Sequence, residues 1–261
     1  MSADLALVGS PIAANAVASP RLELRDVTRT FGARVAVDKV SFRVDAREFV
    51  AVLGPSGAGK TTLFRCMTGL MTPDRGSVRV AGLDVADLHG AARRHIGVVF
   101  QQFNLAGRLS ALDNVLAGRL GYVSAWRGWL RQFTRPDRLL ALQCLDRVGL
   151  LEHAEQRADK LSGGQQQRVA IARVLAQQPD IIVADEPVAS LDPTIGAGIL
   201  DLLREICRAE GMSVVCSLHQ VQLARDYADR VVGLANGRVL FDEPVRAFDR
   251  AAEGALYAPA R

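Results

Sequence analysis

The stretch Gly54-Pro55-Ser56-Gly57-Ala58-Gly59-Lys60-Thr61 lies between an apolar run, Phe49–Leu53, and a segment, Thr61–Leu70, whose pattern predicts a helix. It fits the phosphate-loop pattern of glycine, four residues, glycine, lysine and then serine or threonine. Glycines let consecutive backbone N–H groups converge on phosphates, and the helix adds its positive N-terminal end. Lys60 supplies a mobile positive charge to the β- and γ-phosphates, and Thr61 supplies a hydroxyl for Mg²⁺. The sequence therefore predicts a nucleoside triphosphate site formed by Gly54, Pro55, Ser56, Gly57, Ala58, Gly59, Lys60, Thr61 and Thr62.

A pair of acids ends another apolar run, Ile181–Ala184. A buried strand delivers Asp185 and Glu186 to the carboxyl edge of a sheet, where the ligands of open α/β sheets bind. We expect Asp185 to hold Mg²⁺, directly or through water. A glycine turn without nucleotide and a solvated acid pair are the alternatives that need no ligand.

Length and composition set the class of the molecule. A chain of 261 residues can form one sizeable domain, and an apolar share of 49% excludes a disordered chain. No apolar run approaches the roughly 18 residues that cross a bilayer, so a soluble or peripheral chain is expected. The formal charge of +4 rests on 29 arginines and 3 lysines without a basic stripe, so we expect no nucleic acid partner.

The termini and the cysteines complete this description. Residues 1–20 are small and apolar and lack the basic start of a secretory signal, which predicts a disordered N-terminal extension. Residues 246–261 are expected to form a C-terminal tail. The cysteines show no paired spacing, which suits a reduced cytosol; they are Cys66, Cys144, Cys207 and Cys216.

Hydrophobic patterns divide the main domain, residues 21–245, into three parts. Strand candidates come first, at Arg21–Val27, Val40–Val44 and Phe49–Leu53, with a hairpin over Gly76–Val80 and Gly82–Val85. Helical patterns dominate about residues 102–160, where Asp137 is a plausible N-cap and a buried stripe is expected at Leu139, Leu140, Leu142, Leu145 and Val148. Alternating elements then follow at Gln165–Gln177, Ile181–Ala184, Pro193–Glu210, Ser213–Ser217, Gln220–Asp229 and Val231–Leu234, and Asn236-Gly237 indicates a type I′ hairpin. We predict an α/β fold with a mostly parallel core sheet, an antiparallel β subdomain and an inserted helical subdomain.

A second glycine motif, Leu161-Ser162-Gly163-Gly164-Gln165, follows the phosphate loop by about a hundred residues. Ser162 offers a hydroxyl, the glycines permit close backbone approach, and a helix starts there with its positive end exposed. This is an anion site without a lysine. Together with the phosphate loop, the motif resembles the signature of the ABC (ATP-binding cassette) ATPases, and the resemblance covers about residues 21–245. In that family Ser162, Gly163, Gly164 and Gln165 would reach the nucleotide of a second cassette.

Further residues match that family in order, and their roles are what the resemblance implies. Glu186 resembles the catalytic glutamate that orients and deprotonates the attacking water. Gln101 resembles the glutamine that touches Mg²⁺ or water and links to the transport partner, although Gln102 directly follows it. Asp192 lies in a segment resembling the loop that crosses the dimer interface. His219 resembles the switch histidine on the γ-phosphate, with a capping or core histidine as the alternative. The aromatic expected to stack on adenine is Phe31, with a core phenylalanine as the alternative.

Weaker likenesses point to the phosphonate-import ATPase branch. They are Gln165–Arg168, Ala184–Pro193, Leu218–Val221, and Ala117–Gly121 followed by an aromatic and basic insert through Arg135. In the insert, tryptophans and a phenylalanine fall on one face of a predicted helix and arginines on another. The residues are Trp126, Trp129, Phe133, Arg127, Arg131 and Arg135. The helical subdomain of about residues 102–160 is called the helical lobe below. Either these aromatics pack on this lobe, or they form a docking surface for the membrane subunit or the anionic lipid beside it.

The resemblance implies an ATPase that uses ATP and Mg²⁺ and couples hydrolysis to phosphonate uptake. The implied partners are a second copy of the chain, two transmembrane permease subunits and an extracytoplasmic substrate-binding protein. The implied location is peripheral, at the cytoplasmic face of the cell inner membrane. The alternatives are another cargo such as phosphate, phosphite or an amino acid, an accessory cassette of a soluble phosphonate-degrading complex, an exporter cassette, and a non-transport ABC protein of DNA repair or translation.

Overall fold

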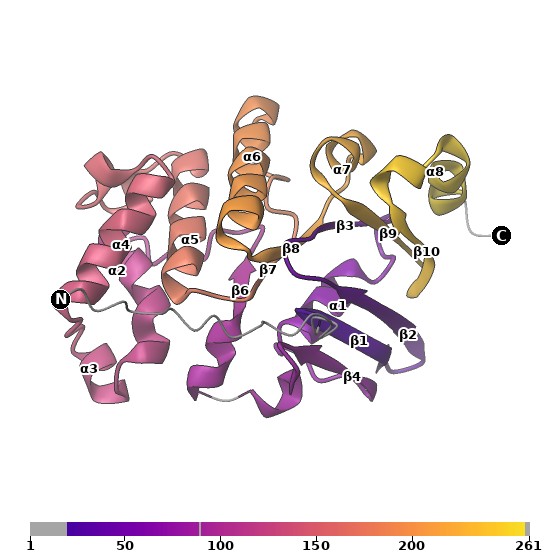
Figure 1. Ribbon diagram of the computed structural model, residues 1–261, viewed down its shortest axis with the longest axis horizontal. Coiled ribbons are helices and arrows are strands. Elements are labelled where there is room, and N and C mark those ends of the chain that lie inside the picture. Colours follow the sequence, from indigo (N-terminus) through magenta and orange to yellow (C-terminus); the bar gives the residue numbers. More distant parts are fainter. Residues whose placement is uncertain (1–19, 89, 259–261) are drawn as a thin grey trace, which may run out of the picture.

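The computed structural model describes residues 20–88 and 90–258, which contain two sheets (Figure 1). The larger sheet has the strand order β10-β9-β3-β8-β7-β6, and the neighbours from β9 to β6 pair in parallel. Its strands are β3 (Phe49–Leu53), β6 (Ile96–Val99), β7 (Ile181–Ala184), β8 (Ser213–Ser217), β9 (Arg230–Ala235) and β10 (Arg238–Pro244). This is the mostly parallel core sheet that the alternating pattern predicts.

The last strand of this sheet reverses direction at the predicted hairpin. β10 pairs antiparallel with β9, and the turn between them is Asn236-Gly237. Both turn residues are left-handed, with φ of 49° and 76°. A type I′ turn requires positive φ at both positions, and asparagine and glycine tolerate it best.

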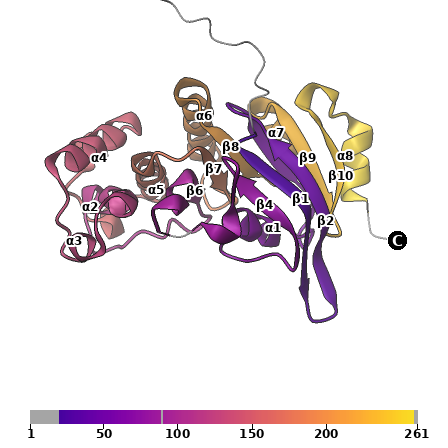
Figure 2. The ribbon, with the colours of Figure 1, turned by 60° about the horizontal axis from the view of Figure 1, so that its bottom comes forward.

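The smaller sheet is antiparallel, with the order β2-β1-β4-β5. Its strands are β1 (Leu22–Phe31), β2 (Arg34–Val44), β4 (Arg75–Val80) and β5 (Leu83–Asp84), so the hairpin predicted at residues 76–85 is confirmed. The helix α1 (Lys60–Met67) shares one apolar core with both sheets through Leu63, Phe64 and Met67. In Figure 2 the β1–β2 hairpin extends beyond the body of the molecule.

All but one of the remaining helices belong to the second apolar core, on the other face of the larger sheet. They are α2 (Ala111–Leu116), α4 (Arg135–Arg147), α5 (Gly163–Gln177), α6 (Pro193–Glu210), α7 (Val221–Tyr227) and α8 (Arg250–Tyr257). The short helix α3 (Ala125–Trp129) has no buried residue and lies outside this core. Short 3₁₀ turns are η1 (Val85–Asp87), η2 (Gly90–His95), η3 (Ala117–Tyr122), η4 (Leu151–His153), η5 (Ala158–Lys160) and η6 (Val245–Ala247). Within the described part of the chain, every helix is too short or too polar to span a bilayer. The extension predicted at the N-terminus lies, up to residue 19, outside the described residues.

The helical lobe differs from the sequence prediction at the start of α4. Thr134 is the N-cap, because its hydroxyl accepts a hydrogen bond from the Asp137 backbone N–H. Asp137 is instead the third helical residue, and its carboxylate reaches back to the Thr134 N–H at 3.2 Å. The two residues form a capping box, in which the acid satisfies the cap's own donor. The prediction of Asp137 as N-cap was therefore wrong by three residues.

Two apolar helix faces that the sequence predicts in the lobe also differ from those in the structure. Leu139 is 57% exposed and does not belong to the buried stripe, whereas Leu145 and Val148 are buried. The aromatic helix predicted from Trp126 to Phe133 is interrupted, because α3 ends at Trp129 and Arg131 is left-handed with φ of 53°. Phe133 packs on the core, but the two tryptophans are exposed. The expectation that all three aromatics share one helix face was wrong.

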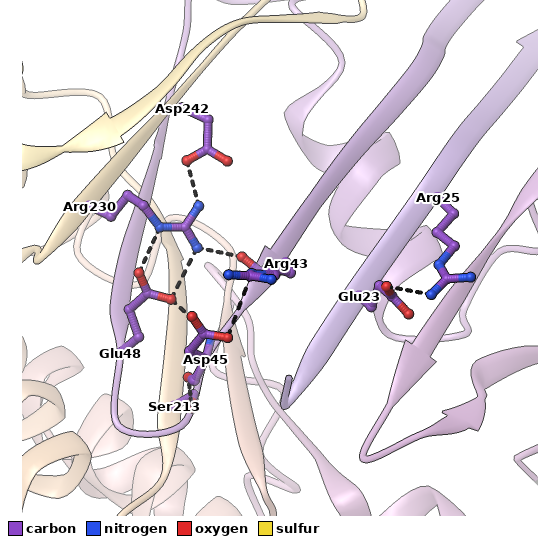
Figure 3. Close-up of polar contacts among 8 residues, drawn as sticks. All are labelled: Glu23, Arg25, Arg43, Asp45, Glu48, Ser213, Arg230 and Asp242. Atoms are coloured by element: carbon purple, nitrogen blue, oxygen red, sulfur yellow. Dashed lines mark hydrogen bonds and ion pairs between the residues drawn. The ribbon is translucent and has the colours of Figure 1, made fainter. Parts of the chain in front are cut away.

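Arg230 joins the two sheets at the end of β3 that lies away from the phosphate loop (Figure 3). Its Nε donates to Glu48 Oε1 at 2.6 Å, and a second nitrogen donates to Glu48 Oε2 at 3.0 Å. It also bonds Asp242 on β10 and the carbonyl oxygen of Arg43 on β2. These carboxylates raise the pKa of the guanidinium against the opposing effect of its burial. The bidentate geometry makes this the strongest type of ion pair between side chains.

We predict that Arg230→Ala lowers the free energy of unfolding by roughly 2–3 kcal/mol, because Glu48 and Asp242 lose charge-assisted hydrogen bonds in a half-buried position. Urea denaturation followed by circular dichroism measures the difference. Arg238→Ala is the matched control, since the Arg238–Asp38 pair lies at the surface and should contribute less than about 1 kcal/mol. Equal losses of unfolding free energy in the two variants would show that the Arg230 network stabilises the fold no more than a surface ion pair does.

Candidate functional site

The phosphate loop is fixed by two close backbone approaches. β3 is buried along its whole length and delivers Gly54 to the carboxyl edge of the sheet, beside β9. A Cβ on Gly54 would lie 2.1 Å from the Leu234 carbonyl oxygen, and one on Gly59 would lie 2.2 Å from that of Ala36. Gly59 also has φ of 102° and caps α1. Only glycine fits these two positions, so the loop is held between β9 of one sheet and β2 of the other.

Lys60 is the first residue of α1 and is only 5% exposed. Its Nζ donates to the carbonyl oxygens of Gly54, at 2.7 Å, and Pro55, at 3.2 Å. Burial lowers the pKa of Lys60, and the nearby carboxylates of Glu186 and Asp185 oppose this effect. The ammonium is therefore folded back onto neutral carbonyls. A phosphate is a stronger acceptor for this cation than a carbonyl oxygen.

The loop opens onto a cavity of about 520 Å³. Four kinds of predicted site residue line it: the aromatic, the loop, the second acid and the histidine. The lining residues are Phe31, Arg34, Ala36, Ser56, Gly57, Ala58, Gly59, Lys60, Thr61, Thr62, Arg65, Glu186 and His219. Phe31 is 47% exposed at the tip of the β1–β2 hairpin, with Arg29 over its ring, so it is not a core phenylalanine. A cavity of this size with a half-exposed aromatic ring in its lining can accept a nucleotide.

The acid pair follows β7 and is tied to the neighbouring strands. The Asp185 N–H donates to the Val99 carbonyl oxygen at 2.9 Å. Burial raises the pKa of Asp185, and a hydrogen bond from the Ser217 hydroxyl, at 3.1 Å, opposes the shift. Glu186 is left-handed, with φ of 50°, and its Oε1 lies 2.6 Å from His219 Nε2. The glutamate and the histidine are thus in contact with each other, and both line the cavity beside the phosphate loop.

The oxygen ligands near the loop suit Mg²⁺. A desolvated carboxylate at Asp185 is stabilised by a cation, and Thr61 and Asp185 line one further cavity together. In the described residues no three histidine, cysteine or acidic side chains form a metal cluster. Magnesium normally takes one or two protein ligands together with phosphate oxygens and water, so this donor set fits it.

Ser217 is a candidate that the sequence motifs do not single out. Its hydroxyl donates to Asp185 Oδ1 and accepts from the Glu186 N–H at 3.1 Å. It ends β8, which pairs with β7 in parallel, so it lies beside the first residue after β7. The signal in the sequence is a serine at the carboxyl end of a buried strand that is expected to lie beside the strand ending in the two acids. Arg34 was also missed; its guanidinium lines the cavity and donates to the Gly57 carbonyl oxygen at 3.3 Å.

Not every predicted site residue faces this cavity. Gln101 and Gln102 are both exposed beyond the end of β6, next to the strand that carries Asp185. Asp192 caps α6 through the Thr194 N–H at 2.9 Å and lines a smaller cavity of about 130 Å³ with Glu186 and His219. His219 is exposed and precedes the α7 cap, so it is neither a core residue nor that cap.

The signature residues lie apart from the phosphate loop and start another helix. Ser162 is the N-cap of α5, and its hydroxyl accepts from the Gln165 N–H at 3.3 Å. The Gln165 side chain accepts from the Ser162 N–H at 2.9 Å. Ser162, Gly163 and Gln165 are at least partly exposed, and none of them lines the cavity of the phosphate loop. The positive end of α5 is therefore open to an anion from outside this chain.

The sequence profile of the ABC transporter family matches residues 37–189, which include both the phosphate loop and the signature. The chain belongs to the ABC transporter ATPase family. It is 48% identical over 240 residues to the hypophosphite import ATP-binding protein HtxD of Stutzerimonas stutzeri, covering 90% of this chain and 70% of that protein. It is 49% identical over 225 residues to the phosphonates import ATP-binding protein PhnC of Rhodopseudomonas palustris, covering 85% and 83%.

A solved structure supports the same family assignment. It is a dimeric ATP-binding cassette in a post-hydrolysis state with bound ADP and Pi. The similarity reaches a TM-score of 0.74 at 36% identity and covers 87% of this chain and 100% of that one. The predicted resemblance and fold class are confirmed, and the chain is an ATP-hydrolysing cassette.

We predict that Lys60→Met abolishes stabilisation by Mg·ATP, because the γ-phosphate loses the cation that replaces its hydration. Nucleotide at a hundredfold excess over its Kd stabilises the parent chain by about 2.7 kcal/mol, which a melting curve detects. Lys39→Met is the control, since Lys39 is an exposed lysine of β2. A variant at Lys60 that keeps the full ATP-dependent rise in melting temperature would remove Lys60 from the phosphate site.

Proposed function

We propose that this chain is the ATPase subunit of an importer for phosphonates and related phosphorus oxyanions, acting as a pair of identical cassettes. The observation that carries the pairing is the separation of the signature from the phosphate loop. Each chain offers a loop with Lys60 and an exposed helix end with Ser162, but the two do not face the same cavity. Head-to-tail pairing of two copies places one chain's α5 against the other's nucleotide. The dimeric state of the related cassette supports this arrangement.

We infer the steps of ATP hydrolysis from the side chains beside the phosphate loop. Lys60 leaves the loop carbonyls to bind the β- and γ-phosphates. Thr61 and Asp185 would hold Mg²⁺, which would supply further positive charge to these phosphates. Glu186 accepts a proton from water as its oxygen attacks the γ-phosphorus. The bond between the γ-phosphorus and the bridging oxygen breaks, and ADP leaves with that electron pair. His219 lies in contact with Glu186 Oε1 and fixes this carboxylate. We infer that it also contacts the γ-phosphate of the bound nucleotide.

We predict that Glu186→Gln lowers kcat by two to four orders of magnitude, as expected for loss of a general base. ATP binding should remain, because the amide keeps the size of the side chain and Lys60 is unchanged. The bound nucleotide then holds two copies together, which size-exclusion chromatography with Mg·ATP detects. Glu155→Gln, at an exposed glutamate outside the cavity, should behave as the parent chain. Parent-like ATP turnover in Glu186→Gln contradicts the assignment.

Two permease subunits are the proposed membrane partners. A groove of about 280 Å³ lies between α1 and the end of β6, lined by residues that include Leu70, Val98 and Phe100. Its apolar side chains lie close to Gln101 in the chain and share the cavity with Asp185. A permease segment in this groove contacts both the nucleotide site and the helical lobe. We infer that the chain acts as a peripheral subunit at the cytoplasmic face of the inner membrane, with an extracytoplasmic protein supplying the cargo.

The cargo is proposed from the relatives, whose names specify hypophosphite and phosphonates. We predict that the complex of this chain, its permease and its binding protein hydrolyses ATP faster when a phosphonate is added. Phosphate release with methylphosphonate, hypophosphite, phosphate and glutamate, each at equal concentration, ranks the cargos. Stimulation of ATP hydrolysis by hypophosphite alone would identify hypophosphite as the cargo within the class of phosphorus oxyanions. Stimulation by glutamate with none by a phosphorus oxyanion overturns the proposal.

A further inference from the structure

The outer end of the helical lobe carries exposed tryptophans. Trp126 is 60% exposed and Trp129 is 83% exposed, and both tryptophans of the chain lie in α3. Figures 1 and 2 place α3 at the edge of the lobe, apart from the larger sheet. We define the α3 surface as the exposed apolar and basic side chains around this helix: Leu120, Tyr122, Trp126, Trp129, Leu130, Arg127, Arg131, Arg135 and Arg138.

The outward direction of the tryptophans has a packing cause. A Cβ on Gly128 would lie 2.9 Å from Leu120 Cδ2 and 3.7 Å from Val123 Cγ2. The helix α3 therefore contacts the segment before it through Gly128. A longer side chain at position 128 would have to displace the flexible end of Leu120. Because α3 contacts the preceding segment through Gly128, the indoles of Trp126 and Trp129 take the outer positions, where most of their apolar area meets water.

The ends of the segment are held in place. The Tyr122 hydroxyl donates to the Gln177 carbonyl oxygen at 3.0 Å, and the Arg119 guanidinium lies 3.5 Å from the centre of its ring. Arg94 lies over the same ring at 4.8 Å. After α3, Phe133 packs on the main core. The α3 surface is therefore a fixed projection, tied to α5 at one end and to the core at the other.

The charge around the tryptophans has a single sign. Asp137 is the only acid between Asp113 and Asp146, and it is buried against Arg119, whose Nε donates to it at 3.0 Å. The pKa of Asp137 is lowered by hydrogen bonds from Thr134 and Arg119, although burial opposes this, so the carboxylate stays charged and cancels Arg119. Arg127, Arg131, Arg135 and Arg138 are exposed. This part of the lobe thus offers arginines and indoles to solvent without an exposed carboxylate of its own segment.

We propose that the α3 surface binds the headgroup region of an anionic phospholipid bilayer. Tryptophan is favoured at the boundary between headgroups and acyl chains, and arginine pairs with anionic headgroups. Exposed indoles at the edge of the lobe can insert into a fluid lipid surface without a preformed cleft. A protein partner would instead need a cleft for each indole and carboxylates for the arginines. This contact goes beyond the proposed function and does not depend on the cargo.

The two tryptophans make the test specific, because the intrinsic indole fluorescence of the full-length chain comes from α3 alone. We predict that vesicles of phosphatidylglycerol and phosphatidylcholine bind the chain in flotation at low salt and shift its tryptophan emission to the blue. Bromine-labelled lipid in these vesicles should quench the emission. Pure phosphatidylcholine vesicles should do neither, and binding should weaken as salt screens the arginines.

Variants separate the apolar and the basic contributions. W126S/W129S should reduce vesicle binding at least tenfold, because the inserted apolar area is lost. R127Q/R131Q should reduce it about 30-fold, since each arginine near an anionic surface contributes about 1 kcal/mol. R75Q/R79Q removes the same charge from exposed positions of β4 and should bind as the parent chain. The ATP-dependent rise in melting temperature should persist in all three, which shows that the variants fold.

Three outcomes overturn the proposal. The first is a full-length chain that does not float with phosphatidylglycerol vesicles. The second is parent-like flotation of W126S/W129S. Other segments, such as residues 1–19, are the same in every variant, so this result would assign the vesicle contact to a segment other than α3. The third is a blue shift that occurs only on adding the detergent-purified permease and not with vesicles, which makes the α3 surface a protein docking site.

Discussion

The buried ammonium of Lys60 is the constraint on which the rest of the site depends. Its desolvation is tolerated because the Gly54 carbonyl oxygen accepts from it at 2.7 Å and because Asp185 and Glu186 lie close enough to favour the charged form. That geometry requires the loop to pass between two backbones, which only Gly54 and Gly59 allow. One of these backbones belongs to each sheet. Both sheets must therefore be assembled before the lysine is correctly placed.

The same edge of the sheet separates two roles among neighbouring acids. Asp185 is held toward the interior by Ser217 and by the end of β6, where burial makes a cation its natural partner. Glu186 turns outward through a left-handed backbone and meets His219. Asp185 and Glu186 follow the end of β7, and the left-handed backbone at Glu186 turns its side chain away from that of Asp185, so one strand end can supply a metal ligand and a base in succession. Ser217 joins them, because its hydroxyl donates to the Asp185 carboxylate and accepts from the Glu186 N–H.

Much of the fold could be read from the sequence where a segment is apolar throughout. The predicted limits of β3, β7, α6 and β8 agree with the structure, since fully buried strands and a helix with Asp192 and Gly211 at its ends leave little freedom. The α4 cap was misplaced because Thr134 and Asp137 are both good cap residues, and tertiary contacts with Arg119 decide between them. The exposure of Leu139 depends on which side of α4 faces the core, which periodicity alone does not reveal. The break after Trp129 needs a left-handed Arg131, which no local signal predicts.

The helical lobe connects its outer surface to the signature through one buried ion pair. Arg119 donates to Asp137, which belongs to the capping box of α4, and also to the Ala176 carbonyl oxygen near the end of α5. Ser162 is the cap at the opposite end of α5. A displacement of η3 or α4 relative to α5 would leave a buried arginine or aspartate without its partner, which costs about 3–5 kcal/mol. The lobe therefore moves most easily as one unit with the signature, so a contact at the α3 surface would act on the helix end that we propose meets the nucleotide of a second copy.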